Sequence, residues 1–520
     1  MTNTKTIAKN SGWYGIDQIV AAVIAIITSI AINRYLGPSK NAYIIYISYI
    51  AGLVSSLGGF GIPATTRKYM AEFIGMGDRG TARYIFLQTL FLQTGLATLA
   101  TGGLLYWVLG HANSDYKLAA ALLVLSMWPS MINSIPAMAN NASEDLSTNL
   151  PGSLAGALTY LIFIMATVVL HWGVVGVGVS QLAQRSVDFL VRFFPTLKRV
   201  LAWEITHVHP PGLRNRMMAF AWPSVATMAI SMIVWGRSEI ILLENLCADI
   251  RQVAFYSLAF TMADMLLMGA NVFGGAAGVT IFVQYGRDKS RLPSITASTF
   301  RYLALISIPL HFIAASLAVP ALLFLYGRQF QDAAMVVALA PLLCIFKAFI
   351  SPAQTLLQCC ERQSFVIAAT VLAGVVDWGV AWWLIPAHGA VGACIGNGAA
   401  QATAVLMMWA VAIHLFKVKL PWLQVAKIVF VSVLASLTAH SIAKLTEHYI
   451  AGQMTQLWVT QLWAILCGGC ASLIVLFGLF YWMRVLEPED HNRLHVLAAM
   501  LPRPIAYPAE KFLLLLIRPQ

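Results

Sequence analysis

Charged residues are scarce in this sequence. Only 10% of its 520 residues are Asp, Glu, Lys or Arg, whereas 59% are hydrophobic. A soluble globular protein carries roughly 25% charged residues. A larger core does not explain the difference, because a soluble surface would still need those charges. The composition therefore excludes a soluble globular protein and indicates a membrane protein that crosses the bilayer several times.

Acidic residues and cysteines are also few. The chain has 33 Lys and Arg residues against 21 Asp and Glu, which gives a net charge of +12. In a membrane protein this excess is typical of basic cytoplasmic loops near anionic lipid, so we expect no nucleic-acid partner. The seven cysteines lie mostly in apolar runs and indicate packing, not a disulfide framework. Cys467 and Cys470 lack a nearby His or acid, and we expect no metal site and no cofactor.

Long hydrophobic runs fill most of the chain. Taking about 20 residues as the length of one crossing, we predict about 14 membrane spans. The first run, after Lys5 and Lys9, is too long for a cleavable signal peptide and is interpreted as a membrane helix. The expected centres are Ile24, Ser55, Thr94, Trp128, Ile162, Ala183, Ser231, Gly269, Pro309, Ile345, Val376, Met407, Leu434 and Leu473.

The distribution of basic residues predicts the orientation. With the N-terminus in the cytoplasm, the cytoplasmic loops hold more than twice as many Lys and Arg residues as the loops on the other side. This asymmetry follows the positive-inside rule. An even number of spans also places the basic C-terminal tail in the cytoplasm. We expect a multi-pass protein of a bacterial cytoplasmic (inner) membrane with both termini inside.

Two glycine-rich segments resemble each other and indicate an internal repeat. "GVVGVGVSQLAQ" begins at Gly173 and "GAVGACIGNGAA" at Gly389, where the sixth and twelfth expected spans begin. Units of six spans have the same orientation and are related by an axis along the membrane normal. The predicted fold is all-α, with two six-helix lobes and two additional C-terminal helices. The expected parts are the N-terminal lobe 1–205, the C-terminal lobe 206–416, the two additional helices 417–485, and a cytoplasmic or interfacial tail 486–520.

Six ionisable residues lie within the expected spans. An ionised side chain at the bilayer centre costs about 2.5–3.5 kcal/mol on insertion scales, so it usually faces the bundle interior or a water-filled cavity. The six residues are Asp17, Arg185, Asp188, Asp264, Lys347 and Asp377. Arg34, Arg237 and Glu239 lie near the expected outer ends of the first and seventh spans.

Each of these residues also has a structural interpretation. Asp17 could extend towards the cytoplasmic surface. Arg185 and Asp188 are three residues apart and could pair on one helix face. Lys347 could form an interhelical salt bridge with Asp264 or Asp377. Arg237 and Glu239 could lie among the outer-leaflet headgroups, and a structural role is favoured for Glu239.

Lys347 is unusual because Pro341 and Pro352 flank it within an apolar run. Broken helices at mid-depth are tolerated where they line a cavity. A cation in such a place favours an anionic cargo such as a phosphate or diphosphate. We therefore expect Arg34, Arg185, Arg237 and Lys347 to bind an anionic headgroup. The acidic residues expected to couple transport to protons or cations are Asp17, Asp188, Asp264 and Asp377.

The sequence contains none of the common catalytic motifs that we considered. It has no P-loop, no HExxH and no GxSxG. The longest connection, about 196–215, is too short for a membrane-bound glycosyltransferase or ligase domain. We expect a transporter and not an enzyme.

One segment resembles a known family. Residues 34–78, "RYLGPSKNAYIIYISYIAGLVSSLGGFGIPATTRKYMAEFIGMGD", are similar to the start of Wzx-type polysaccharide transporters of the multidrug/oligosaccharidyl-lipid/polysaccharide exporter superfamily. The segment that begins at Trp235 resembles the connection between the seventh and eighth spans of that family. The segment that begins at Leu325 resembles its C-terminal half. The chain differs from the usual start at residues 40–42, "KNA", where the family commonly has an acidic residue, a phenylalanine and a glycine.

The resemblance implies two six-helix lobes around a cavity that opens alternately to each side. It implies a flippase that moves polyprenyl-diphosphate-linked oligosaccharide to the outer leaflet, for O-antigen, capsule or exopolysaccharide synthesis. Membrane lipid, a polysaccharide polymerase and glycosyltransferases are the implied partners. Only Arg34 falls within a motif of the family, whereas Arg185, Arg237 and Lys347 are inferred from burial.

Two other functions remain open at this stage. A drug/cation antiporter of the same superfamily would need an acidic, aromatic cavity and would have little need for Lys347. A lipid II flippase for peptidoglycan fits the count of about 14 spans.

Overall fold

The computed structural model describes residues 4–111, 113–206, 210–451 and 456–486. For residues 4–19 and a few other helical positions it describes the backbone alone. The side chain of Asp17 and the expected tail therefore lie outside the described residues.

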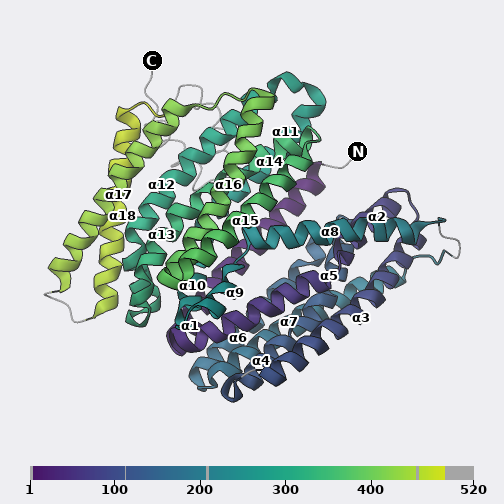
Figure 1. Cartoon of the computed structure of the whole chain (residues 1–520). Helices are drawn as coiled ribbons and strands as arrows, with labels where there is room; N and C mark the ends of the chain where they lie inside the picture. The colour runs from purple at the N-terminus through teal and green to yellow at the C-terminus, as the bar shows by residue number, and fades with distance from the viewer. Residues whose placement is uncertain (1–3, 112, 207–209, 452–455, 487–520) are drawn as a thin grey trace. The chain divides into compact units, whose positions relative to one another are not determined.

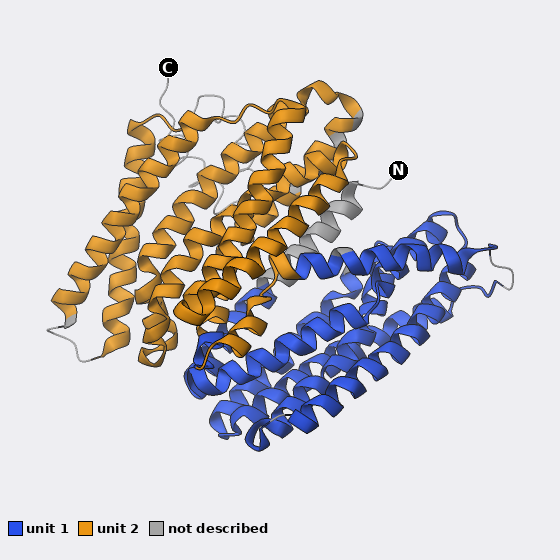
Figure 2. Ribbon diagram, in the orientation of Figure 1, with its two compact units in different colours: residues 1–232, 249–254 blue, residues 233–248, 255–520 orange. Residues whose placement is uncertain are grey.

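The described residues form α-helices and short 3₁₀ segments and no strands (Figure 1). They fall into two compact units, which are residues 1–232 with 249–254, and residues 233–248 with 255–520 (Figure 2). The fold class expected from the sequence, an all-α polytopic membrane protein, is thus confirmed. The boundaries of the four expected parts stay a prediction.

The first unit contains eight helices, the last of which continues into the second unit. They are α1 (Thr4–Gly58), α2 (Ile62–Gly75), α3 (Arg79–His111), α4 (Lys117–Leu125), α5 (Met127–Ala142), α6 (Leu150–Val169), α7 (Gly173–Leu201) and α8 (Leu213–Trp235). Two short 3₁₀ segments, η1 (Ser114–Tyr116) and η2 (Leu146–Thr148), lie between them.

The second unit contains the other helices, with α10 beginning in the first unit. They are α9 (Glu239–Leu246), α10 (Arg251–Leu266), α11 (Met268–Arg287), α12 (Leu292–Tyr326), α13 (Ala334–Cys344), α14 (Ile350–Cys359), α15 (Gln363–His388), α16 (Ala390–Phe416), α17 (Trp422–Ala451) and α18 (Leu457–Trp482). The 3₁₀ segments here are η3 (Lys289–Arg291), η4 (Arg328–Ala333) and η5 (Ile345–Phe349). Helices α17 and α18 pack against each other and against α12.

Eleven helices of the described residues are long and apolar enough to span a membrane, or twelve if the bent pair α10 and α11 counts as one span. The expectation of about 14 differs for two reasons. Helix α1, with 55 residues, is about 80 Å long and contains a kink at Gly37, so one helix covers the first two expected spans. Helix α7 is not among the eleven because Arg185, Asp188 and Arg192 interrupt its apolar character. Every expected centre nevertheless falls in a helical segment.

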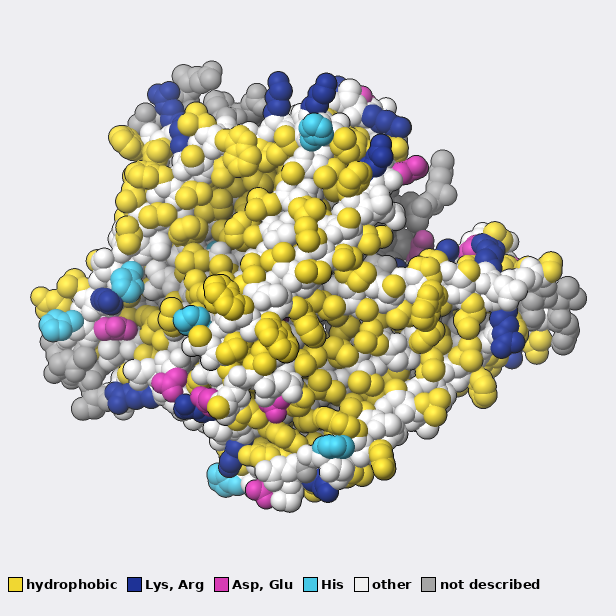
Figure 3. All heavy atoms as spheres, viewed as in Figure 1, with side chains coloured by type: hydrophobic (Ala, Val, Ile, Leu, Met, Phe, Trp, Pro, Cys, Tyr) yellow, Lys and Arg dark blue, Asp and Glu magenta, His cyan; other side chains and the backbone are white. Residues whose placement is uncertain are grey.

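The surface of the helices matches a lipid environment. On the face shown in Figure 3, hydrophobic side chains cover the sides of the helices, and most Lys and Arg side chains gather near helix ends. Exposed tryptophans lie near both ends of the last two helices, with Trp422 and Trp482 at one end and Trp458 at the other. Tryptophan is enriched at membrane interfaces, where its ring meets both lipid and water.

The two matching glycine pairs have the same structural roles. Gly173 and Gly389 both have positive φ, 61° and 53°, at the turn before α7 and α16. Gly176 and Gly392 lie where each helix approaches the preceding one. A Cβ atom at Gly176 would overlap the side chain of Thr167, and one at Gly392 would be 2.6 Å from the backbone of Leu384. Small residues at such places permit close helix packing.

We predict that Gly392→Ala destabilises the protein by about 1–3 kcal/mol, because the added methyl group would overlap backbone atoms of Leu384 and Ile385 that cannot rotate away. Gly379→Ala on α15 is the matched control, since a Cβ atom added there would meet no other atom within 4 Å. Thermal unfolding of the purified protein should show a lower midpoint for the first variant only. Equal midpoints would contradict the close packing of α15 and α16.

Candidate functional site

The turn between α8 and α9 brings three polar residues, Arg237, Ser238 and Glu239, into the second unit. Arg237 is partly buried, and its Nη1 donates to Ser257 Oγ on α10 at 2.7 Å. Its guanidinium carbon lies 5.4 Å from the centre of the Phe260 ring. Among the described residues no carboxylate forms an ion pair with Arg237. Most of its five N–H donors are therefore available to another acceptor.

Lys347 lies where the helix after η4 is interrupted. The chain changes from α13 to the 3₁₀ segment η5 and back to α14, so the expected break around Lys347 is present. Its Nζ lies 2.9 Å from Asp264 Oδ1. The Lys347 side chain is 18% exposed and that of Asp264 is 48% exposed. The interhelical salt bridge given above as the structural interpretation of Lys347 is observed with Asp264, between partners that reach the surface of the unit. Exposed ion pairs contribute only about 0–1 kcal/mol.

Phe260 connects the two cations. Lys347 Nζ is 5.5 Å from its ring centre, a distance similar to that of Arg237, and both are within cation–π range. The ring of Tyr256, one helical turn earlier on α10, lies 6.1 Å away. The two cations therefore share one aromatic ring: Lys347 is paired with Asp264, whereas Arg237 has no carboxylate partner among the described residues.

Glu239 lies in a buried polar cluster beside these cations. It is 0% exposed and accepts hydrogen bonds from Tyr256 Oη and Asn397 Nδ2, both at 2.7 Å. Gln401 Nε2 donates in turn to Asn397 Oδ1 at 2.6 Å. Helices α9, α10 and α16 thus supply one continuous network. The headgroup position expected for Glu239 is wrong, because its side chain is enclosed by protein.

Asp377 of α15 completes this cluster. It is also 0% exposed, and its carboxyl interacts with the carboxyl of Glu239 and the hydroxyl of Ser238. Neither Asp377 oxygen accepts a well-formed hydrogen bond from the described residues. Two adjacent carboxylates in a low-dielectric interior repel each other and lose hydration, so such a pair is stable only with a proton or a small cation between them.

Sequence reasoning selected Asp377 but missed its partners. Glu239 had a detectable signal, because it is followed directly by apolar residues within a hydrophobic run. A second signal pointed to Asn397 and Gln401. They are four residues apart in a helix of otherwise small and apolar residues, so they share one face.

In the first unit, the "RYLGP" motif forms the kink of α1. Gly37 has φ 71° and ψ 175°, which only glycine adopts readily. Tyr35 Oη accepts a hydrogen bond from the backbone N–H of Gly173 at 3.0 Å. Asn41 Nδ2 donates to Asn33 Oδ1 across the kink at 2.7 Å. The motif is therefore largely structural, whereas Arg34 itself is exposed on the surface of this unit.

Arg185 and Asp188 do not pair with each other, contrary to one structural interpretation of them. Asp188 instead forms a 2.8 Å ion pair with Arg192 and accepts a 2.8 Å hydrogen bond from Asn133. A Cβ atom at Gly152 of α6 would overlap its carboxylate, so Asp188 lies in close packing. Arg185 is exposed in the middle of α7 and has no carboxylate partner among the described residues. In a membrane helix such a residue faces water more readily than lipid.

The structure thus brings some of the expected residues together and separates others. Arg237, Lys347 and Asp264 form one group, and Asp377 forms a second group with Glu239. Arg34, Arg185 and Asp188 belong to the first unit. The described residues contain no group of three or more His, Cys, Asp or Glu side chains that could hold a metal ion.

The described helices form a polytopic bundle, and its fold is similar to that of solved MOP superfamily structures. The chain is similar to the solved structure of a lipid II flippase, MurJ, in an inward closed conformation, with 14% identity and a TM-score of 0.69 over 90% of this chain and 99% of that one. It is similar to an inward-facing multidrug resistance MATE transporter of the MOP superfamily, with 16% identity and a TM-score of 0.64 over 76% and 95%.

A third similar structure is a MOP superfamily transporter from Pyrococcus furiosus, which is described as having a binding pocket of reverse polarity. Its identity is 14% and its TM-score 0.54, over 79% of this chain and 96% of that one. Neither a protein-family model nor a curated protein matches the sequence. At these identities the similarity shows the fold alone.

We predict that Tyr256→Phe destabilises the protein by about 1–3 kcal/mol, because Glu239 would lose a donor that water cannot replace at a site of 0% exposure. Asp264→Asn on the same helix is the matched control and should change stability by less than about 1 kcal/mol. Thermal unfolding in one detergent compares the two. If Tyr256→Phe unfolds at the wild-type midpoint, the buried network does not exist as described.

Proposed function

We propose that the protein is a flippase that moves a polyprenyl-diphosphate-linked oligosaccharide from the cytoplasmic to the outer leaflet by alternating access. The observation that carries this proposal is the partly buried Arg237, which has no carboxylate partner among the described residues and shares the Phe260 ring with Lys347. A diphosphate is a large anion that accepts several hydrogen bonds, and guanidinium groups bind it in a favourable geometry.

The fold supports the proposal. The similar structures include a lipid II flippase, and the sequence resembles Wzx-type flippases in residues 34–78. We assign the cargo to surface polysaccharide synthesis on that resemblance, with a polymerase and glycosyltransferases as the expected partners. The location in a bacterial inner membrane, the cytoplasmic position of both termini and the four-part domain scheme belong to the same proposal.

Arg34 and Arg185 contribute further cations in the first unit. Both are exposed on the surface of their unit, and Arg185 has no carboxylate partner among the described residues. We propose that these two residues and the Arg237–Lys347 pair bind the headgroup at different stages of one transport cycle.

We propose that Glu239 and Asp377 bind the coupling ion, a proton or a small cation. A carboxyl pair that lacks a counter-charge inside the protein is stabilised when such an ion binds. Asp264 and Asp188, also expected to couple transport, already have basic partners at 2.9 Å and 2.8 Å. We therefore propose a weaker contribution for Asp264 and a structural role for Asp188.

Two other cargoes remain candidates. Lipid II has the same polyprenyl diphosphate and would use the same cations, and the similarity to MurJ favours it. A drug antiporter is favoured by the buried Glu239–Asp377 pair and by the similarity to MATE transporters. The three functions differ in the sugar that the protein carries and in the organic cations to which it gives resistance.

Arg237→Ala and Lys347→Ala should each weaken binding of a polyprenyl-diphosphate sugar by about 10- to 100-fold, since a hydrogen bond to a charged group contributes about 1.5–3 kcal/mol. Arg237→Lys and Lys347→Arg should retain part of the affinity. Binding to the purified protein and surface polysaccharide in cells are the two measurements.

Lys444→Ala is the control for these variants, because Lys444 is an exposed cation on α17 away from the site. If both alanine variants bind lipid-linked sugar and support polysaccharide like the wild type at equal expression, the anion site is wrong. Loss of drug resistance with intact polysaccharide would favour the antiporter.

Glu239→Gln and Asp377→Asn should abolish the response of transport to an imposed proton or sodium gradient in proteoliposomes, because each change removes one carboxylate of the pair. Binding of the lipid-linked sugar should persist in both variants. Glu244→Gln, on the same helix α9, is the matched control. Gradient-dependent transport at wild-type rates in both variants would exclude this pair as the coupling site.

A further inference from the structure

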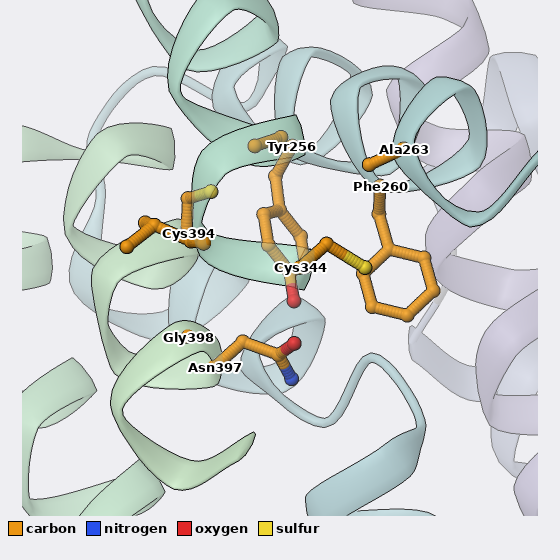
Figure 4. A pocket seen from close by; sticks show the side chains of 9 residues that line it. Tyr256, Phe260, Ala263, Cys344, Cys394, Asn397 and Gly398 are labelled. Carbon is orange, nitrogen blue, oxygen red and sulfur yellow. The ribbon is translucent and has the colours of Figure 1, made fainter. Parts of the chain in front are cut away.

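A small cavity lies in the second unit between α10, α13 and α16 (Figure 4). Its lining includes Tyr256, Phe260, Ala340, Cys344, Cys394 and Asn397. Its volume is about 10 Å³, close to the smallest space that holds one water molecule. Figure 4 shows the hydroxyl of Tyr256 pointing towards the side chain of Asn397, with the thiol of Cys344 beside the Phe260 ring.

One end of the cavity meets the buried carboxyl pair. Tyr256 and Asn397 both line the cavity and both donate hydrogen bonds to Glu239. Cys394, which also lines the cavity, is on the same helix as Asn397. A molecule in the cavity would therefore be separated from Glu239 by a single hydrogen-bonded side chain.

The cavity lining also leads to the ion pair of Lys347 and Asp264. Phe260, whose ring lines the cavity, also contacts the ammonium group of Lys347. Lys347 in turn pairs with Asp264 at 2.9 Å. Asp264 is about half exposed, so this ion pair reaches the surface of the unit.

We propose that this cavity binds a single water molecule and is the route by which the coupling ion reaches Glu239 and Asp377 from the side of Lys347 and Asp264. The proposal rests on the coupling role given above to the carboxyl pair. The water can donate to the Tyr256 oxygen or to the Asn397 carbonyl oxygen and accept from the Cys344 thiol. The charged and titratable groups around the route are Arg237, Glu239, Tyr256, Asp264, Cys344, Lys347, Asp377 and Cys394.

Three native cysteines of equal burial allow a direct test. Cys344 and Cys394 line the cavity and are 7% and 6% exposed, whereas Cys359 is 6% exposed and does not line it. In full-length proteins that keep one of these cysteines and carry serine at the other six positions, Ag⁺ serves as a small water-borne cation. It displaces the thiol proton and forms a silver thiolate, which blocks later maleimide labelling of the unfolded protein.

In proteoliposomes we expect Ag⁺ to block Cys344 and Cys394 at least about tenfold faster than Cys359, since access to Cys359 needs local opening of the helix packing. Ala340→Leu fills the cavity and should slow the reaction of Cys394 to the Cys359 rate. Ala340→Val, with a smaller added volume, should give an intermediate rate and covers the case in which the leucine variant does not fold.

Equal rates for Cys394 and Cys359 would overturn the route, and so would fast reaction of Cys344 alone, because the carboxyl pair would then be closed from that side. The failure of this proposal is distinct from that of the proposed function. Silver access does not depend on the cargo, so reactive thiols without any binding of lipid-linked sugar would leave the route intact and remove the flippase. Transport of the sugar without reactive thiols would leave the flippase intact and remove the route.

Discussion

The cost of placing an ionised group away from water governs this structure. A charge in the hydrocarbon region must be paired, hydrogen-bonded or in contact with water. Asp188 meets the condition with Arg192 and Asn133 inside the helix bundle of its unit. Lys347 meets it with Asp264 and with exposure, and Glu239 with Tyr256 and Asn397. Arg237 and Asp377 meet this condition least well among the described residues. The guanidinium of Arg237 has N–H donors without an acceptor, and the carboxyl of Asp377 accepts no well-formed hydrogen bond. The proposed function follows from these two exceptions.

The first exception, Arg237, lies close in the chain to Glu239, the carboxyl that neighbours Asp377. Arg237 and Glu239 are two residues apart at the start of α9, and their partners Ser257 and Tyr256 are adjacent on α10. A change in the position of α9 against α10 would alter both hydrogen bonds together. Neutralising the carboxyl of Glu239 would then change the hydrogen bonding of the partly buried Arg237 without any long pathway. Coupling between sites needs an element with two arrangements that both sites bias, and this helix pair is the element that the geometry offers.

Much of the fold could be predicted from hydrophobic run length alone, because the thickness of the bilayer sets the length of a helix. The position of the break at Lys347 was visible from Pro341 and Pro352, and the roles of Gly173 and Gly389 from their matched contexts. The pairing of charged residues with one another was predicted less well. The spacing of Arg185 and Asp188 suits an ion pair as well as that of Asp188 and Arg192 does, and only the packing of α5 and α6 against α7 selects between them. Glu239 was missed because its partners come from three different helices, which a one-dimensional pattern does not bring together.

The distribution of burial separates two kinds of ion. In the second unit, Lys347 is paired with the half-exposed Asp264, whereas the partly buried Arg237 has no carboxylate partner in the part of the chain that the structure describes. The enclosed carboxyls of Glu239 and Asp377 favour positive charge, but the cavity beside them, of about 10 Å³, admits nothing larger than a water molecule or a bare ion. The unpaired guanidinium of Arg237 suits an anionic ligand and the enclosed carboxyl pair suits a small cation, which agrees with the proposed flippase better than with export of a bulky cation.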